Sequence, residues 1–492
     1  MSISTADIVR PRIPARILFP AGVGLGIYGL LMPAGARLLN DPDTYWQVRI
    51  GQSIIETGAL PHADGFSFTM TGQPWISTQW LAQAIYAIVY GAFGWAGLVV
   101  LTSASIALTF VLLARFLERR LPVAPALMLL LCGFAIGAPH FLARPHTLAM
   151  PVMVAWVAGL VAAAERRAAP SPWLLPLMAL WTNLHGSFVL GLALVAPVAF
   201  DALWNAQAEK RPRLALLWFG FLLAAVAASC LTPYGWESLL AAKKILSLGQ
   251  ALSLIGEWRP VDLSKWEGVS LFLFAGLGGV LLTGFTLTLP RVLLFVGLLY
   301  MALSHSRNVD VFALLSPIVL AAPLAMRLGV RTGVMSTTDE NPQASLRWSA
   351  AAILLACVLT FTIVPMRRYS PPAATSPSAA IAALKERKVS RVFNDYDYGG
   401  YLIWSGLPTF IDGRTELFGE DFMVRYDDAA SLKNPQALFD LLKAYNIEAT
   451  LLHRTTPAAR LLDRTDGWTR IYADDSVVVH MRTDASANTT LQ

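Results

Sequence analysis

Residues 41–80 of the chain read DPDTYWQVRIGQSIIETGALPHADGFSFTMTGQPWISTQW and stand between two strongly apolar runs. The stretch begins as an amphipathic helix does, because Asp41 suits the N-cap and Pro42 suits the first helical position. Gly58 is placed to end that helix. A return rich in polar and aromatic residues follows. The pattern predicts a long polar loop, residues 39–95, on a chain that is otherwise apolar.

The overall composition places this loop on a membrane protein. Of the 492 residues, 55% are hydrophobic and 14% are charged, and the mean hydropathy is +0.53. Soluble proteins carry about 25% charged residues. Residues 1–366 are apolar with short polar interruptions, which predicts a transmembrane domain. A Pro/Ala/Ser linker over 367–380 leads to residues 381–492, which we expect to form a soluble α/β domain.

A helix that crosses a bilayer needs about 20 predominantly apolar residues. One apolar segment, 172–183, contains Pro172 and Pro176 and is too short to cross fully at about 1.5 Å per residue. With it, we expect about eleven spans in a mainly α, polytopic membrane helical bundle. The other expected spans are 17–38, 96–117, 121–139, 146–164, 187–204, 213–231, 269–287, 290–305, 309–328 and 348–366.

The net charge of +6 is spread over short loops, so no nucleic-acid partner is expected. Basic residues gather in alternate loops, as is typical of cytoplasmic loops. With a cytoplasmic N-terminus (Met1 to Arg16) and an odd number of spans, the C-terminal domain would lie on the outer face. The three cysteines all lie in apolar runs, so no disulfide framework is indicated. The basic residues of the expected inner loops are Arg115, Arg119, Arg120, Arg166, Arg167, Lys210, Arg211, Arg213, Arg291, Arg327, Arg331 and Arg347.

The remaining polar clusters gather on the opposite, outer side, and they include five of the seven histidines. Polar residues at membrane depth are costly and usually mark a functional site. Guanidinium and imidazolium donors match phosphate oxygens. Arg144 has an alternative role as a headgroup anchor, and His185 as a satisfied histidine at a helix break. The expected binding site for a lipid phosphate consists of Arg144, His146, His185, Arg307 and Asn308.

Three carboxylates on the same side are the candidate catalytic groups. Asp41 has a structural explanation as a helix cap. Asp43 has a weaker one, since an acid in the first turn only complements the helix dipole. Glu257 is a third acid that would orient an acceptor or complete a metal site. A divalent metal ion is one option, but no spacing resembles a dedicated metal motif, so the sequence commits to no cofactor.

Alternating helix and strand signals after residue 381 predict a small three-layer α/β domain. We expect helices at 381–387, 399–404, 435–445 and 457–463, and strands at 391–394, 409–412, 448–453, 468–472 and 476–481.

The expected strand ends carry the runs Asn394-Asp395-Tyr396 and Asp412-Gly413-Arg414, where open α/β sheets usually bind ligands. Turn chemistry with a stabilising Asp–Arg pair is the alternative interpretation. Gly399-Gly400 before a helix is a weak signal for anion binding. Together with the first loop, this domain would contact the acceptor. The expected acceptor or outer-domain site comprises Asp64, Trp75, Trp80, Asn394, Asp412 and Arg414.

The chain resembles the type C glycosyltransferase superfamily, in particular its bacterial members related to the protein-mannosyltransferase group. The shared features are a long first outer loop that opens with acidic residues and an odd-numbered bundle with an outer C-terminal domain. The resemblance covers nearly the whole chain. It rests on the first loop and on RPH (144–146), NLHGSFVLG (183–191), GEWRP (256–260), SRN (306–308), GGYLIW (399–404) and FIDGR (410–414).

The resemblance implies a multi-pass protein of the bacterial inner membrane, with its N-terminus cytoplasmic and its C-terminal domain periplasmic. It implies an enzyme that moves a sugar from a polyprenyl-phosphate donor to an acceptor hydroxyl of a glycan, lipid or protein. The resemblance implies that an acid of this loop acts as the base or helps to hold a divalent ion. Asp43 is the first candidate for this role and Asp41 the second. Protein mannosyltransferases pair Asp with Glu directly in this loop, whereas this chain has Asp-Pro-Asp.

Two other classes of function use the same residues differently. A transporter or flippase for a lipid-linked glycan would bind phosphate with the same arginines and histidines, although the sequence has no visible inverted repeat. A non-catalytic assembly factor for an envelope glycan would need neither the carboxylates nor the cations. An enzyme requires Asp43, His185, Glu257 and Arg307 to meet around one site.

Overall fold

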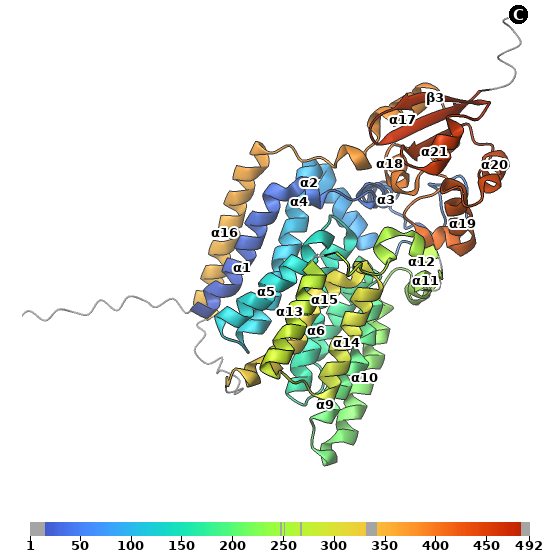
Figure 1. Ribbon diagram of the computed structural model, residues 1–492. Helices are drawn as coiled ribbons and strands as arrows, with labels where there is room; N and C mark the ends of the chain where they lie inside the picture. The colour runs from blue at the N-terminus through green and yellow to red at the C-terminus, as the bar shows by residue number, and fades with distance from the viewer. Residues whose placement is uncertain (1–14, 247, 250, 266–267, 331–341, 484–492) are drawn as a thin grey trace, which may run out of the picture.

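The computed structural model of the protein describes residues 15–246, 248–249, 251–265, 268–330 and 342–483. Residues 1–14 and Arg331, which contribute to the predicted orientation, lie outside the described residues. A bundle of long helices carries an α/β region at one end (Figure 1).

Seven helices of the described chain are long and apolar enough to cross a membrane. The chain is therefore a multi-pass membrane protein with a mainly α fold, as predicted. These crossings are formed by α1 (Ala15–Leu31) with α2 (Gly35–Leu38), α4 (Trp80–Glu118), α5 (Val123–Gly137), α6 (Pro145–Glu165), α10 (Arg211–Ser229), α15 (Val309–Arg327) and α16 (Pro342–Met366).

Shorter helices complete the bundle, and each of the eleven expected spans corresponds to a helix. The number of complete crossings stays a prediction, because several of these helices are shorter than a bilayer requires. The shorter helices are α7 (Leu175–Leu184), α8 (Phe188–Ala193), α9 (Val195–Trp204), α13 (Gly268–Thr283) and α14 (Leu289–Ser304).

The helix α4 is broken at Gly94, where the backbone has a φ of 58° and a ψ of −151°. Glycine adopts this conformation readily because it lacks a Cβ. The break separates residues 80–93, which belong to the expected first loop, from residues 95–118, which match the expected span at 96–117.

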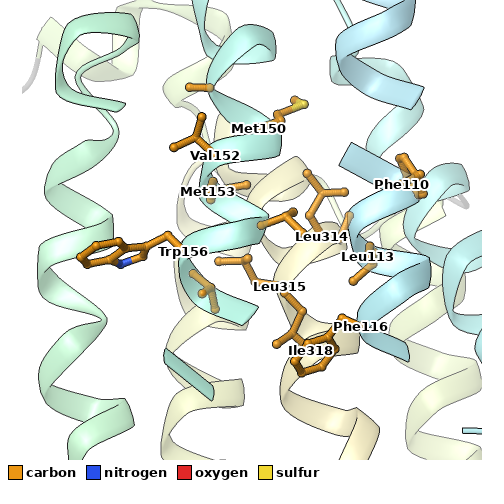
Figure 2. Close-up of a cluster of buried hydrophobic side chains, with 14 of the residues drawn as sticks. Phe110, Leu113, Phe116, Met150, Val152, Met153, Trp156, Leu314, Leu315 and Ile318 are labelled. Atoms are coloured by element: carbon orange, nitrogen blue, oxygen red, sulfur yellow. The ribbon is translucent and has the colours of Figure 1, made fainter. Parts of the chain in front are cut away.

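The centre of the bundle is packed by α4, α6 and α15. Phe116 of α4 and Leu315 and Ile318 of α15 are buried between these helices, as Figure 2 shows. Trp156 of α6 points the other way and stacks on Phe221 of α10, with ring centroids 5.6 Å apart. Lipid tails are as apolar as leucine, so this packing stabilises the bundle mainly through van der Waals contact.

The first loop opens with α3 (Asp43–Thr57), which Gly58 ends in the left-handed conformation with a φ of 65°. The predicted end of this helix is confirmed. The return that follows pairs with the α/β region through a bridge between Ser67 and Thr409. Two short helices, α11 (Glu237–Leu246) and α12 (Ala251–Leu254), lie at the same end of the bundle (Figure 1).

The α/β region contains a four-stranded mixed sheet in the order β1-β2-β4-β3. The pair β1 and β2 is parallel, and the other pairs are antiparallel. Its elements are α17 (Ser378–Glu386), β1 (Val392–Asn394), α18 (Gly399–Trp404), α19 (Thr415–Ala430), α20 (Pro435–Ala444), β2 (Ala449–His453), α21 (Pro457–Leu462), β3 (Trp468–Ala473) and β4 (Val477–Arg482).

Both faces of the sheet are covered by helices, as the three-layer prediction requires. Val392 packs in a cluster with α17 and α18, whereas its neighbour Phe393 packs in a cluster with α19, α20 and α21. The predicted strand at 409–412 was wrong: Thr409 forms only an isolated bridge, and the chain then turns into α19, which the sequence pattern did not predict.

Candidate functional site

The start of α3 places two carboxylates side by side. Asp41 is fully buried, and its Oδ1 accepts the backbone N–H of Asp43 at 2.8 Å; the helix begins one residue later than predicted, with Pro42 at the N-cap. Asp43 stands in the first turn, where its Oδ1 accepts the indole N–H of Trp46 at 2.9 Å. Its other oxygen, Oδ2, faces the guanidinium of Arg144.

Arg144 joins both carboxylates to the rest of the site. It precedes Pro145 at the start of α6 and is therefore extended, as a residue before proline usually is. Tyr86 donates its hydroxyl to the Arg144 carbonyl at 2.9 Å and fixes the backbone there. The guanidinium pairs with Asp41 and lies 3.6 Å from Asp43 Oδ2.

A second segment brings Glu257 to the same guanidinium. Glu257 pairs with Arg144 through one oxygen, and its other oxygen lies 3.3 Å from Nη1 of Arg307. Arg307 stacks over the Trp258 ring at 4.3 Å, and Ser306 donates its hydroxyl to the Glu257 carbonyl at 3.0 Å. These contacts tie the turn before α15 to the loop after α12.

One ion-pair network, which we call the Arg144 cluster, joins Asp41, Asp43, Arg144, Glu257 and Arg307. All three expected catalytic carboxylates and two of the expected phosphate ligands belong to it. Its members come from four segments that are far apart in the sequence.

The two expected histidines lie beside the Arg144 cluster. Their rings are 6.0 Å apart, and the charges of Arg144, Glu257 and Arg307 all act on His185. Nδ1 of His185 accepts the N–H of Ser187 at 3.2 Å, which leaves Nε2 to carry the proton of the neutral ring.

His146 is held from two sides. Its Nε2 lies 3.3 Å from the carbonyl of His140 and 3.8 Å from Oδ2 of Asp310. Asp310 was not among the predicted residues, although an acid at the start of an apolar run was a signal that could have identified it. Asn308 donates its side-chain amide to the Met301 carbonyl at 3.2 Å, so its observed contact joins two helices.

Burial and neighbouring charges shift the pKa values of Asp43 and Glu257 in opposite directions. Burial raises the pKa of Asp43 to about 7; the Trp46 hydrogen bond opposes the rise, and the nearby carboxylates Glu257, Asp397 and Asp412 add to it. Burial also favours the neutral form of Glu257, but Arg144 and Arg307 outweigh it and lower the pKa of Glu257 to about 2. Glu257 is thus a fixed anion, whereas Asp43 exchanges a proton near neutral pH, the difference that an acid–base site needs.

The expected acceptor residues form a buried interface between the first loop and the α/β region. Arg414 has no exposed surface; its Nη1 lies 2.5 Å from Asp64, and its Nη2 lies 2.7 Å from Asp412. Asn394 is equally buried: it donates to the Ile411 carbonyl and accepts from the Phe410 N–H, each at 2.8 Å.

Trp75 belongs to the same interface, with its indole N–H donated to Glu416 at 2.9 Å. The Asp–Arg pair that was the alternative interpretation of Asp412 and Arg414 is therefore present. The acceptor-binding role stays a prediction that this geometry does not support, because these side chains have little or no exposed surface.

Trp80 is placed differently, at the edge of a hollow. Its indole N–H is donated to Asn183 Oδ1 at 2.7 Å. The hollow has a volume of about 640 Å³ and a mainly apolar lining. It is lined by Trp80, Leu81, Ala179, Leu180, Asn183, Cys230, Leu231, Thr232 and Pro233.

The Arg144 cluster does not fit a divalent ion, because the guanidinium lies between the three carboxylates and pairs with each of them. Among the described residues, one group of three side chains brings ligand atoms together as a metal site requires, and it is Asp395, Asp397 and His453. Asp395 was expected at a ligand-binding strand end, but Asp397, His453 and the metal role of the group were not predicted from the sequence.

Neither a family model nor a curated protein matches the chain. Comparison with solved structures finds an oligosaccharyltransferase of Archaeoglobus fulgidus in the apo form, at 10% identity and a TM-score of 0.55, over 91% of this chain and 70% of that one. The oligosaccharyltransferase AglB of the same organism, in complex with an inhibitory peptide and a dolichol-phosphate, matches at 11% identity and a TM-score of 0.53, over 88% and 69%.

ArnT of Cupriavidus metallidurans, bound to undecaprenyl phosphate, matches at 12% identity and a TM-score of 0.50. That match covers 96% of this chain and 98% of ArnT. The expected fold is thereby confirmed: the chain is similar in structure to membrane glycosyltransferases of type C along nearly its whole length.

Proposed function

We propose that this chain, which has the fold of the type C glycosyltransferases, transfers a sugar from a polyprenyl-phosphate carrier to an acceptor hydroxyl. The observation that carries the proposal is the Arg144 cluster. It brings three carboxylates and two guanidinium groups from distant segments into one partly buried network. Charged groups are costly beside a membrane and are usually retained for function.

Asp43 is the proposed base. A hydroxyl is a poor nucleophile at neutral pH, so a carboxylate within hydrogen-bond reach must take its proton as the new bond forms. With a pKa raised to about 7, Asp43 accepts that proton with more driving force than an ordinary carboxylate does. Oδ1 is held by Trp46, so the acceptor would meet Oδ2, whose 3.6 Å contact with Arg144 is too long for a hydrogen bond.

The guanidinium groups of Arg144 and Arg307 would bind the leaving phosphate. As the bond between the anomeric carbon and the phosphate oxygen breaks, its electron pair moves to that oxygen, and fixed cations stabilise the new charge. Glu257 holds the two arginines by bridging them, so it is a positioning residue in this mechanism. His185 would add a neutral N–H donor at the edge of the site.

The acceptor oxygen attacks the anomeric carbon from the side opposite the phosphate. The bond to the acceptor forms as the bond to the phosphate breaks, and the proton goes to Asp43. Attack from the side opposite the phosphate inverts the configuration of the sugar. One carboxylate suffices because the phosphate leaves without a proton. No step involves a metal ion, since Arg144 lies where an ion would be held by the carboxylates.

The comparisons support this donor class. ArnT was solved with undecaprenyl phosphate and the archaeal AglB with a dolichol-phosphate, so proteins of this fold bind phosphorylated polyprenols. The basic loops predicted from the sequence support an orientation with the Arg144 cluster and the α/β region on the outer face of a bacterial inner membrane.

The proposal is tested by incubating the purified full-length protein in nanodiscs with labelled undecaprenyl-phosphate sugars and a set of glycan, lipid and peptide acceptors. We expect release of undecaprenyl phosphate together with a labelled product, with and without EDTA. Movement of the labelled lipid between leaflets of a proteoliposome, without product, would instead identify a flippase. Donor binding without either result would identify an assembly factor.

A further inference from the structure

Asp395, Asp397 and His453 meet at one edge of the sheet. The two aspartates follow β1, and His453 ends β2. These strands are parallel neighbours, with Asn394 paired to Leu451, so their carboxyl ends lie side by side. Ligand sites of open α/β sheets usually lie at this edge.

The spacing of the three side chains suits a metal ion. Nε2 of His453 lies 3.6 Å from Oδ2 of Asp397 and 3.9 Å from Oδ1 of Asp395, and the ligand atoms all lie within 4.8 Å of one another. In a tetrahedral zinc site with bonds of about 2.1 Å, neighbouring ligand atoms are about 3.4 Å apart. Small side-chain movements would close the site.

The hydrogen bonds behind His453 allow the tautomer that a metal ligand needs. Nδ1 lies 2.8 Å from the hydroxyl of Tyr398, and that hydroxyl donates its own proton to the Ser476 carbonyl at 3.3 Å. In the tautomer in which Nδ1 donates to that hydroxyl, Nε2 carries no proton. Nε2 then directs a lone pair at two carboxylates, an arrangement that a cation between them stabilises.

Within the described part of the chain, His453 is the one basic side chain that pairs with these two aspartates. Neither Asp395 nor Asp397 forms an ion pair with an arginine or lysine among the residues that the structure describes. The carboxylates of the Arg144 cluster, by contrast, all pair with guanidinium groups. The Asp397 side chain is 59% exposed, so an ion and its bound water can reach the site from solvent.

We propose that Asp395, Asp397 and His453 bind a divalent transition-metal ion such as Zn²⁺, with a water molecule as the fourth ligand. The ion ties the carboxyl ends of β1 and β2 together. The segment that it holds includes Tyr396, whose hydroxyl lies 3.0 Å from that of Thr415, and borders the Arg144 cluster. This site is separate from the Arg144 cluster, and binding of the ion requires no sugar transfer.

The test uses full-length protein in detergent, carrying an affinity tag without histidine and stripped with EDTA. Zn²⁺ binding is measured by isothermal titration, and retained metal by mass spectrometry after dialysis. The variants are Asp397→Asn and His453→Gln. Asp475→Asn, which removes an exposed carboxylate from the same region, is the matched control.

We expect one Zn²⁺ per wild-type and control chain, with affinity reduced at least tenfold in each site variant. Zinc should raise the unfolding temperature of the wild type and the control but not of the site variants. Wild-type protein that retains no zinc would overturn the proposal, and so would site variants that bind zinc as the wild type does. The wild-type result decides even if a variant fails to fold.

Discussion

The carboxylate of Asp43 lies directly against the backbone of Gly413. A Cβ at residue 413 would lie 2.1 Å from Oδ1 of Asp43 and 3.0 Å from Nε1 of Trp46, so a side chain fits there only if Asp43 moves. Gly400 similarly allows the carbonyl of Pro42 to approach, since a Cβ on it would lie 2.2 Å away. The α/β region therefore packs against the start of α3 and limits the conformations of the proposed base.

Gly413→Ala should displace the Asp43 carboxylate without unfolding the bundle. A misplacement of about 1 Å can cost a hundredfold in rate, so we expect kcat to fall by about that factor. Gly65→Ala is the matched control, because, within the part of the chain that the structure describes, no heavy atom beyond its chain neighbours lies within 4 Å of its Cβ position. Equal transfer rates in the two variants would show that this contact does not position Asp43.

Arg414→Met should destabilise the fold, because it leaves Asp64 and Asp412 buried without their cation. Breaking a buried ion pair by removing one partner costs about 3–5 kcal/mol. Arg470→Met, which removes an exposed pair with Asp463, should cost about 1 kcal/mol or less. Thermal unfolding checks both values. A stable Arg414→Met protein with a raised KM for acceptor would instead support the acceptor-binding role expected from the sequence.

Arg307→Ala should weaken binding of the lipid donor. A hydrogen bond to a charged group contributes about 1.5–3 kcal/mol, which corresponds to an increase in Kd of about tenfold to a hundredfold. Arg259→Ala is the control, since that exposed arginine donates to the Ser253 carbonyl and does not join the Arg144 cluster. Binding of undecaprenyl phosphate, measured by native mass spectrometry, distinguishes them. Unchanged donor affinity in Arg307→Ala would contradict the phosphate-binding role.

The first loop and its carboxylates could be predicted because their residue types carry the signal. An acid before proline at the start of a helix indicates a cap, and arginines or histidines next to apolar helices indicate a site. For Arg144, Glu257 and Arg307, the sequence indicated only that all three lie on the same side of the membrane. Their pairing required the packing of α6 and α15.

Other parts of the site depend on contacts that no local pattern contains. Asp64 pairs with Arg414 across most of the chain, so spacing gave no indication of that contact. Positions 413 and 400 require glycine because the start of α3 approaches them closely, not because of the turns around them. The helix α19 was missed since Gly419, with a φ of 76°, interrupts its periodicity.

The activity should depend on pH through Asp43. The base acts when it is ionised, and burial raises its pKa to about 7, so kcat/KM should rise with pH through about 7 and level off above it. Glu257→Gln removes a negative charge beside Asp43. It also removes the ion-pair partner of Arg144, so the Arg144 charge acts more strongly on Asp43. Both changes favour ionised Asp43. The rising limb should therefore move to lower pH. A limb that stays in place or moves upward would exclude Asp43 as the titrating base.

The most direct measurement of the central claim compares transfer by the wild type and by Asp43→Asn, with donor binding measured on the same samples. Removal of a general base costs roughly 10²–10⁴ in rate, so we expect that loss of transfer with donor affinity changed by less than about threefold. Asp262→Asn serves as the control and should behave as the wild type, because Asp262 is an exposed carboxylate that follows Glu257 in the sequence. Asp43→Asn protein that transfers sugar at the wild-type rate would contradict the account.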